Sequence, residues 1–166
     1  MLDFVLPYDQ SPAVLVTTVQ NAALQSARDI GGKRIGVEQG SSYERYLNKQ
    51  LEILAPDAKP ISYPFDKVRI AVYANEDLAY QDLALGAGRR IDALVANQVS
   101  AEARIAKTPG KFRIVGAPLY AEPNWVATDK GDVAFQRKLV EIFAALKRDG
   151  TLSRLSIKWL GRDTTE

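Results

Sequence analysis

The sequence contains no cysteine and no histidine among its 166 residues. Without them the chain cannot form a disulfide, the usual zinc sites or a histidine-based catalytic triad. The formal net charge is only +2, and the basic residues are scattered, unlike the basic surface of a nucleic-acid-binding protein. No apolar run approaches the length of a membrane span, and residues 1–20 lack the basic-then-apolar pattern of a signal peptide. We therefore expect no metal, no cofactor and no nucleic acid partner.

Nucleotide-binding and acid–base motifs are also missing. There is no P-loop and no Gly-x-Gly-x-x-Gly, and the glycine pair in Gly86–Arg90 fits a turn that ends a helix. Carboxylates remain available for acid–base chemistry, but no two of them are spaced along the sequence in a way that indicates a catalytic pair. The candidates are Glu38, Glu44, Asp77, Asp82 and Asp92. We expect no catalytic residue.

The sequence does have a regular alternation of strand-like and helix-like segments. Runs of β-branched residues predict strands, and apolar residues at helical spacing predict helices. Strands are expected at 13–19, 34–38, 61–65, 67–73, 91–96, 112–116 and 124–128, with Pro64 placing 61–65 at a sheet edge. Helices are expected at 42–54, 76–85, 99–107, 132–148 and 151–160, and a polar helix-like stretch at 20–29. The alternation predicts an α/β fold with a largely parallel sheet.

A helix start at Gly40, Ser41 and Ser42 follows the strand at 34–38. Gly40 permits the turn, and either serine can cap the helix. A helix N-terminus favours an anion because its N–H groups are unpaired and its dipole is positive there. Many helices begin in this way, so the residues alone also allow an ordinary helix start.

A second polar group, Asn97 and Gln98, follows the strand at 91–96. In α/β sheets, ligands bind beyond the carboxyl ends of the strands. With Glu38 and the serines, these residues predict a polar cleft for a small charged ligand.

Five segments resemble, in the same order, segments of the solute-binding proteins of polar amino-acid ABC transporters (family 3). They are "LDFVLPYDQSPAVLVT", "IGVEQGSS", "AYQDLALGAGRRIDALVAN", "KFRIVGAPLYAEPNWVATDKGD" and "ALKRDGTLSRLSIKWLG". The resemblance implies a periplasmic-binding-protein type II-like fold, in which two α/β lobes are joined by hinge strands. Residues 13–120 would form one complete lobe, and 1–12 and 121–166 the hinge strands and the remnant of the incomplete lobe. Family members carry a further segment before the first of these motifs, so we expect a truncated binding protein.

The resemblance also implies a set of ligand-binding residues: Tyr8, Glu38, Gly40, Ser41, Ser42 and Asn97. The serines match the positions that hold the ligand's α-carboxylate, and Glu38 matches a position that faces the ligand. Asn97 stands where the family has the aspartate that neutralises the α-ammonium. An amide brings no charge, so either Glu38 supplies it or the ligand is not an ordinary α-amino acid.

The function implied by the resemblance is binding of polar amino acids or related small carboxylates for an ABC permease, in the periplasm and without catalysis. Because the truncated chain would lack half of the pocket, we expect it to bind ligand weakly or not at all. Two alternatives stay open at this point. Some relatives are dehydratases of cyclohexadienyl acids, for which Glu38 would be the acid, and the same fold serves as a sensor or interaction module.

The two closing helices carry apolar faces that the missing segment would cover. Their apolar residues include Phe135, Leu139, Phe143, Leu152 and Leu155. We expect Trp159 to pack in a core with Leu155 and Leu160. We also expect the chain to associate with a second copy through the Asp132–Leu160 region.

Overall fold

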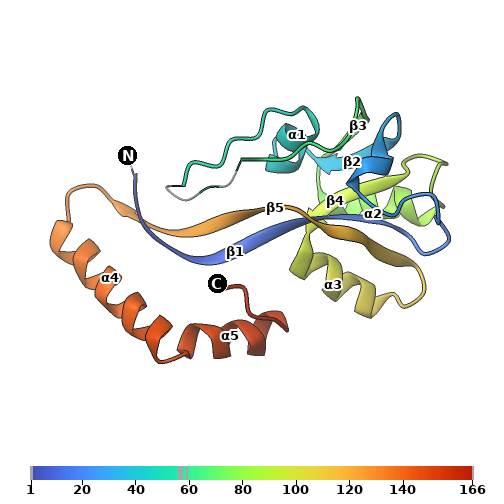
Figure 1. Cartoon of the computed structure of the whole chain (residues 1–166). Coiled ribbons are helices and arrows are strands. Elements are labelled where there is room, and N and C mark those ends of the chain that lie inside the picture. The colour runs from blue at the N-terminus through green and yellow to red at the C-terminus, as the bar shows by residue number, and fades with distance from the viewer. Residues whose placement is uncertain (1, 56–57, 59, 166) are drawn as a thin grey trace. The chain divides into compact units, whose positions relative to one another are not determined.

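The computed structural model describes residues 2–55, 58 and 60–165. The strands are β1 (Leu2–Thr18), β2 (Arg34–Glu38), β3 (Arg69–Tyr73), β4 (Ala93–Asn97) and β5 (Phe112–Asp129). The helices are η1 (Ala27–Ile30), α1 (Ser42–Leu47), α2 (Glu76–Ala84), α3 (Gln98–Lys107), α4 (Val133–Arg148) and α5 (Thr151–Leu160), η1 being a 3₁₀-helix (Figure 1). Within the described ranges, no helix is both long enough and apolar enough to cross a membrane.

The chain divides into two compact units. The sheet unit is Pro12–Ala121, and the helix unit combines Met1–Ser11 with Glu122–Glu166. The sequence placed the corresponding boundaries at residues 13 and 120. That these units are the two lobes of a family fold stays a prediction.

The five strands form one sheet in the order β3-β2-β4-β1-β5. β2 is parallel to both β3 and β4, whereas β1 is antiparallel to β4. The predicted α/β class is confirmed. The expectation of a largely parallel sheet holds for β3, β2 and β4 only, because strand–helix alternation does not determine the direction of the first strand.

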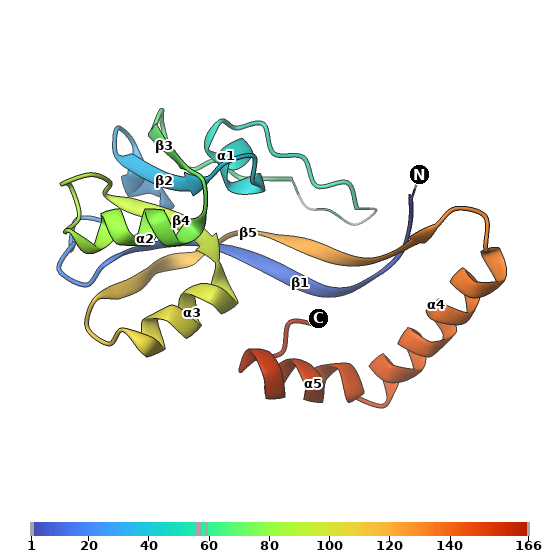
Figure 2. The same ribbon diagram turned by 180° about the vertical axis from the view of Figure 1, so that it is seen from behind.

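Both faces of the sheet in the sheet unit are covered, and adjacent residues of β1 point to opposite faces. Ala13 and Leu15 belong to the core beneath α1, whereas Val14 and Val16 belong to the core beneath α2 and α3 (Figure 2). The first core also contains buried side chains from η1 and the loops: Ile30 of η1, and Leu24, Leu51, Phe65 and Val68 of the loops. Two layers around one sheet therefore give this unit a closed interior.

The segment from 48 to 65 differs most from its sequence prediction. α1 ends at Leu47 instead of continuing to 54, and Lys49 adopts a left-handed backbone (φ +59°), which a helix cannot continue through. No strand forms over the described residues 61–65. Instead, the rings of Tyr63 and Phe65 lie 5.3 and 5.4 Å from that of Tyr46, so the apolar residues anchor a loop on α1.

Two further predictions of local structure are corrected. The strands expected at 112–116 and 124–128 are parts of the single strand β5, which continues past Gly116 although that residue has a left-handed backbone (φ +64°). The helix-like stretch at 20–29 is only the single turn η1, whose Ser26 and Asp29 form a reciprocal cap.

In the helix unit, α4 and α5 leave part of their apolar surface open. Phe135 is 50% exposed, Leu155 47% and Trp159 72%. The prediction that Trp159 lies in a core is therefore wrong for this chain, because the described residues do not cover that face of α5. The contacts inside the unit are both polar and aromatic: the amide of Gln136 donates to Asp3 (3.1 Å) and Thr128 (3.0 Å), and the ring of Tyr8 lies 6.0 Å from that of Phe143.

Candidate functional site

The carboxyl ends of three parallel neighbours, β2, β3 and β4, meet at one edge of the sheet. Glu38 at the end of β2 pairs in register with Tyr73 at the end of β3. α1, α2 and α3 each begin directly after one of these strands, capped by Ser41, Asn75 and Asn97. Three helix N-termini therefore lie at one edge, the part of an α/β sheet at which ligands commonly bind. We call this region the strand-end corner, and it consists of Glu38, Gly40, Ser41, Ser42, Glu76, Asn97 and Ser100.

Gly40 and Ser41 build the turn into α1. Gly40 has a left-handed backbone (φ +70°), as the sequence predicted. The Ser41 hydroxyl donates to the Glu38 carbonyl (2.6 Å) and accepts from the Glu44 N–H (3.3 Å), while the Glu44 carboxylate accepts from the Gly40 N–H (2.8 Å). These contacts give Ser41 the capping role among the two serines.

Ser42 is positioned by a buried aromatic side chain. The Tyr120 hydroxyl donates to Ser42 Oγ (3.1 Å), and the Tyr120 ring lies 4.9 Å from that of Tyr46. Tyr120 comes from β5 and is almost fully buried. The hydroxyl of Ser42 is therefore held at the corner by the core behind it.

Asn97 serves as the cap of α3. Its Oδ1 accepts from the N–H groups of Val99 (2.8 Å) and Ser100 (3.2 Å). The two bonds occupy the carbonyl oxygen that would otherwise accept from an ammonium group. The ligand-binding role expected for Asn97 stays a prediction.

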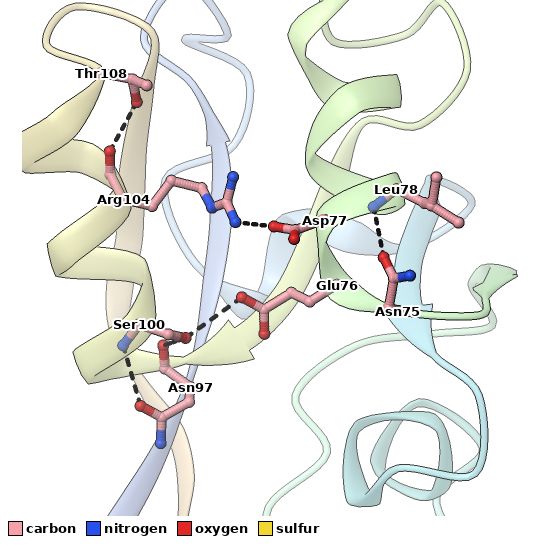
Figure 3. Close-up of polar contacts among 8 residues, drawn as sticks. All are labelled: Asn75, Glu76, Asp77, Leu78, Asn97, Ser100, Arg104 and Thr108. Atoms are coloured by element: carbon pink, nitrogen blue, oxygen red, sulfur yellow. Dashed lines mark hydrogen bonds and ion pairs between the residues drawn. The ribbon is translucent and has the colours of Figure 1, made fainter.

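Glu76 belongs to the corner and was missed by the sequence analysis. It is the first residue of α2, and its carboxylate reaches α3, where the Ser100 hydroxyl donates to it at 3.3 Å (Figure 3). Burial raises the pKa of Glu76, and the charges of Glu38 and Asp77 raise it further against the opposing effects of Ser100 and Arg104. Its position at a strand end was the available signal, but the sequence did not show that β3 lies beside β2.

The residues next to Glu76 stabilise the contact between α2 and α3. Arg104 pairs with Asp77 (Figure 3), and its guanidinium lies 4.3 Å from the centre of the Tyr80 ring. The Tyr80 hydroxyl is buried and has no hydrogen-bond partner among the described residues. Burial raises the pKa of Tyr80, and the negative charge of Glu76 raises it further.

Tyr8, the remaining predicted site residue, belongs to the helix unit. Its ring lies 6.0 Å from that of Phe143 on α4, and it lines a cavity of about 160 Å³ inside that unit. Its contact with a ligand stays a prediction. Asp92 is structural, because its carboxylate accepts from the Arg34 N–H (2.7 Å) where β2 begins. No group of three or more acidic residues in the described ranges is arranged to hold a metal.

Comparisons with known proteins identify relatives that match almost the whole chain. The L-cystine-binding protein TcyJ of Escherichia coli (strain K12) is 29% identical over 165 residues, which are 99% of this chain and 56% of that protein. The putative amino-acid ABC transporter-binding protein PatH of Vibrio harveyi is 29% identical over 167 residues, covering 98% of this chain and 60% of that protein. The chain thus spans less than two thirds of the length of these relatives. No family model matches the chain.

Solved structures agree with these relatives. An ancestral arginine-binding protein bound to arginine is 29% identical with a TM-score of 0.71, covering 95% of this chain and 64% of that chain. The probable amino-acid ABC transporter extracellular-binding protein ytmK of Bacillus subtilis is 23% identical with a TM-score of 0.76, covering 96% of this chain and 64% of that chain, and shows the shared fold. The fold is therefore that of periplasmic-binding-protein type II-like structures. The resemblance found in the sequence is confirmed: the chain is a homologue of the solute-binding proteins of amino-acid ABC transporters.

Proposed function

We propose that the chain is part of the ligand-binding component of an ABC importer for polar amino acids or related small carboxylates. The observation that carries the proposal is the strand-end corner, in a chain whose relatives are named as amino-acid-binding proteins. The proposed location is the periplasm, and the proposed macromolecular partner is the ABC permease. Several relatives are themselves named as periplasmic proteins.

The ligand's carboxylate would bind at the beginning of α1. Ser42 is held there by Tyr120, and Ser41 closes the turn. A hydroxyl that donates to a carboxylate makes a charge-assisted hydrogen bond, which is shorter and stronger than one between neutral groups. The proposed ligand therefore carries a carboxylate near α1 and its other polar groups near α2 and α3.

The proposed role is binding without catalysis. A dehydratase would need a well-placed acid, and the acid that the sequence offered for it, Glu38, is exposed at the end of β2. Glu38 therefore lies open to water, outside the enclosed setting in which a general acid is usually held. Release of water from prephenate or arogenate by the purified chain would contradict this part of the proposal.

The test of the proposal is a binding screen of the chain against L-amino acids, including L-cystine, L-arginine and L-histidine, by isothermal titration calorimetry. The half of the pocket that the chain would carry should bind at least one of them weakly, and Ser42→Ala should weaken that binding about tenfold because one charge-assisted hydrogen bond is lost. Asn48→Ala, at the other end of α1, is the matched control and should bind as the unaltered chain does. A chain that binds no amino acid would contradict the proposal. A Ser42→Ala variant with unchanged affinity would contradict the proposed carboxylate site.

We also propose that the chain associates with a second copy through α4 and α5. Exposed apolar side chains lie along both helices: Val133, Phe135, Val140, Ile142, Leu155, Ile157 and Trp159. Every copy of the chain carries this apolar surface, and in a two-fold dimer each copy covers the surface of the other. Analytical ultracentrifugation should show a dimer that Trp159→Gln weakens, and a monomer at every concentration would contradict the pairing.

A further inference from the structure

The ammonium group of the proposed ligand needs a negative charge at the strand-end corner, and Asn97 does not supply one. Asn97 is neutral, and its Oδ1 already accepts from the N–H groups of Val99 and Ser100. An ammonium group that leaves water binds best to a charged acceptor, because charge-assisted hydrogen bonds are about twice as strong as neutral ones. Another carboxylate at the corner must therefore take this role.

Glu76 lies beside the position that Asn97 occupies. Ser100 joins the two residues, because its N–H donates to Asn97 Oδ1 (3.2 Å) while its hydroxyl is shared between the Asn97 carbonyl (3.0 Å) and Glu76 Oε1 (3.3 Å) (Figure 3). One hydroxyl proton shared between two acceptors satisfies neither fully. The Glu76 carboxylate therefore keeps most of its capacity to accept hydrogen bonds.

Arg104 offsets the negative charge of Glu76 only in part. The nearby cation, Arg104, is paired with Asp77 and stacked over the ring of Tyr80. The buried Tyr80 hydroxyl, which has no hydrogen-bond partner in the described ranges, lies within electrostatic reach of Glu76. A half-buried carboxylate without a full counter-charge is costly to the folded chain, and a cation from outside relieves that cost.

We propose that Glu76 supplies the negative charge that binds the ligand's ammonium group, in place of the residue at position 97. The inference rests on the proposed amino-acid-binding function and names the residue that determines recognition of the amino group. Glu38 adds a second negative charge at the neighbouring strand end, within electrostatic reach of Glu76. The corner therefore favours ligands with a neutral or basic side chain over L-glutamate and L-aspartate.

The test compares L-arginine and L-histidine with their N-acetyl derivatives, which keep the carboxylate and lose the ammonium. Affinity is measured by the shifts of backbone amide signals in nuclear magnetic resonance spectra of the intact chain, a method that also detects weak binding. Glu76→Gln should weaken binding of the free amino acids about tenfold, the effect of one charge-assisted bond, and leave the acetylated forms unchanged. Glu76→Gln with Asn97→Asp should recover part of the lost affinity, because a carboxylate is restored at position 97, which Ser100 links to position 76.

Glu52→Gln is the control, since Glu52 is an exposed carboxylate of the sheet unit that lies outside the strand-end corner. It should leave the affinity for the free amino acids unchanged. Unaltered binding by Glu76→Gln, or an equal loss for free and acetylated ligands, overturns the role of Glu76 while leaving the proposed function intact. Failure of the unaltered chain to bind any amino acid overturns the proposed function and this inference with it.

Discussion

The sheet unit and the helix unit bury their apolar residues to different extents. In the sheet unit, Leu15 and Leu94 have no exposed surface, and each belongs to a different face of the sheet. In the helix unit, no residue of α4 is buried, and α5 buries only Ser156. One unit has a complete interior, whereas the other presents a helical surface that needs a cover.

The difference matters for the proposed function, because the proposed binding site lies in the unit with the complete interior. The strand-end corner is built on the unit that has two closed cores, so its side chains are positioned by packed strands and helix caps. The helix unit combines polar contacts, such as Gln136 with Asp3 and Thr128, with the contact between the rings of Tyr8 and Phe143. Polar contacts at a surface contribute less to stability than the burial of a large apolar side chain.

The largest expected effect comes from truncating matched leucines in the two units. Leu94→Ala should lower the free energy of unfolding by about 3 kcal/mol, because it leaves a cavity in a closed core. Leu155→Ala in the half-exposed position on α5 should cost less than about 1 kcal/mol. Both tryptophans, Trp125 and Trp159, lie in the helix unit, so their fluorescence reports that unit, and amide hydrogen exchange at β2 and β4 reports the sheet unit. Equal losses in the two variants would remove the distinction between the units.

A smaller effect is expected from two glycines of the sheet unit. A Cβ at Gly36 would come within 2.9 Å of Ile91 Cδ1 and 3.3 Å of the Tyr73 ring, so Gly36→Ala should cost about 1–3 kcal/mol through overpacking. Gly40→Ala meets no neighbour within 4 Å but must keep a left-handed backbone, which costs about 1 kcal/mol. Urea denaturation of both variants measures the difference. A Gly36→Ala variant as stable as the parent would show that this core is looser than its contacts indicate.

The smallest expected effect is a gain in stability from Glu76→Gln in the absence of ligand. The pKa of Glu76 is raised in the folded chain, so its ionised form destabilises the fold above that raised pKa. The penalty disappears as the pH falls below the ordinary glutamate value of 4.5, where the residue is protonated in both states. Glu76→Gln should therefore raise the melting temperature at pH 7 and have no effect near pH 4. The gain should be under about 1 kcal/mol because water screens a carboxylate that is only half-buried. A loss of stability at pH 7 would show that the folded chain already supplies Glu76 with a full counter-charge.

The sequence predicted the parts of the fold that depend on local pattern. The short alternating pattern of β2 and the helical pattern of α5 gave the observed bounds of both elements. The Gly40 turn followed from the need for a left-handed backbone. The two serines and Asn97 were placed correctly at strand ends, although their contact with a ligand stays a prediction.

Features that depend on tertiary contacts were not predictable from the sequence. The apolar residues Tyr63 and Phe65 suited a strand, but packing against Tyr46 placed them in a loop. Glu76 was missed because strand pairing, which sequence spacing does not specify, brings the end of β3 beside that of β2. Trp159 was assigned to a core because its helix is amphipathic, and amphipathicity alone does not supply the covering surface.

The central claim is that the strand-end corner of the sheet unit binds an amino acid. The most direct measurement is a titration of the isotope-labelled chain with L-arginine and the other L-amino acids, followed through the backbone amide signals. The account predicts that at least one amino acid shifts the signals of residues 40–43, 76 and 97–100, while those of α4 and α5 stay in place. Shifts confined to α4 and α5, or no shift with any amino acid, would contradict it.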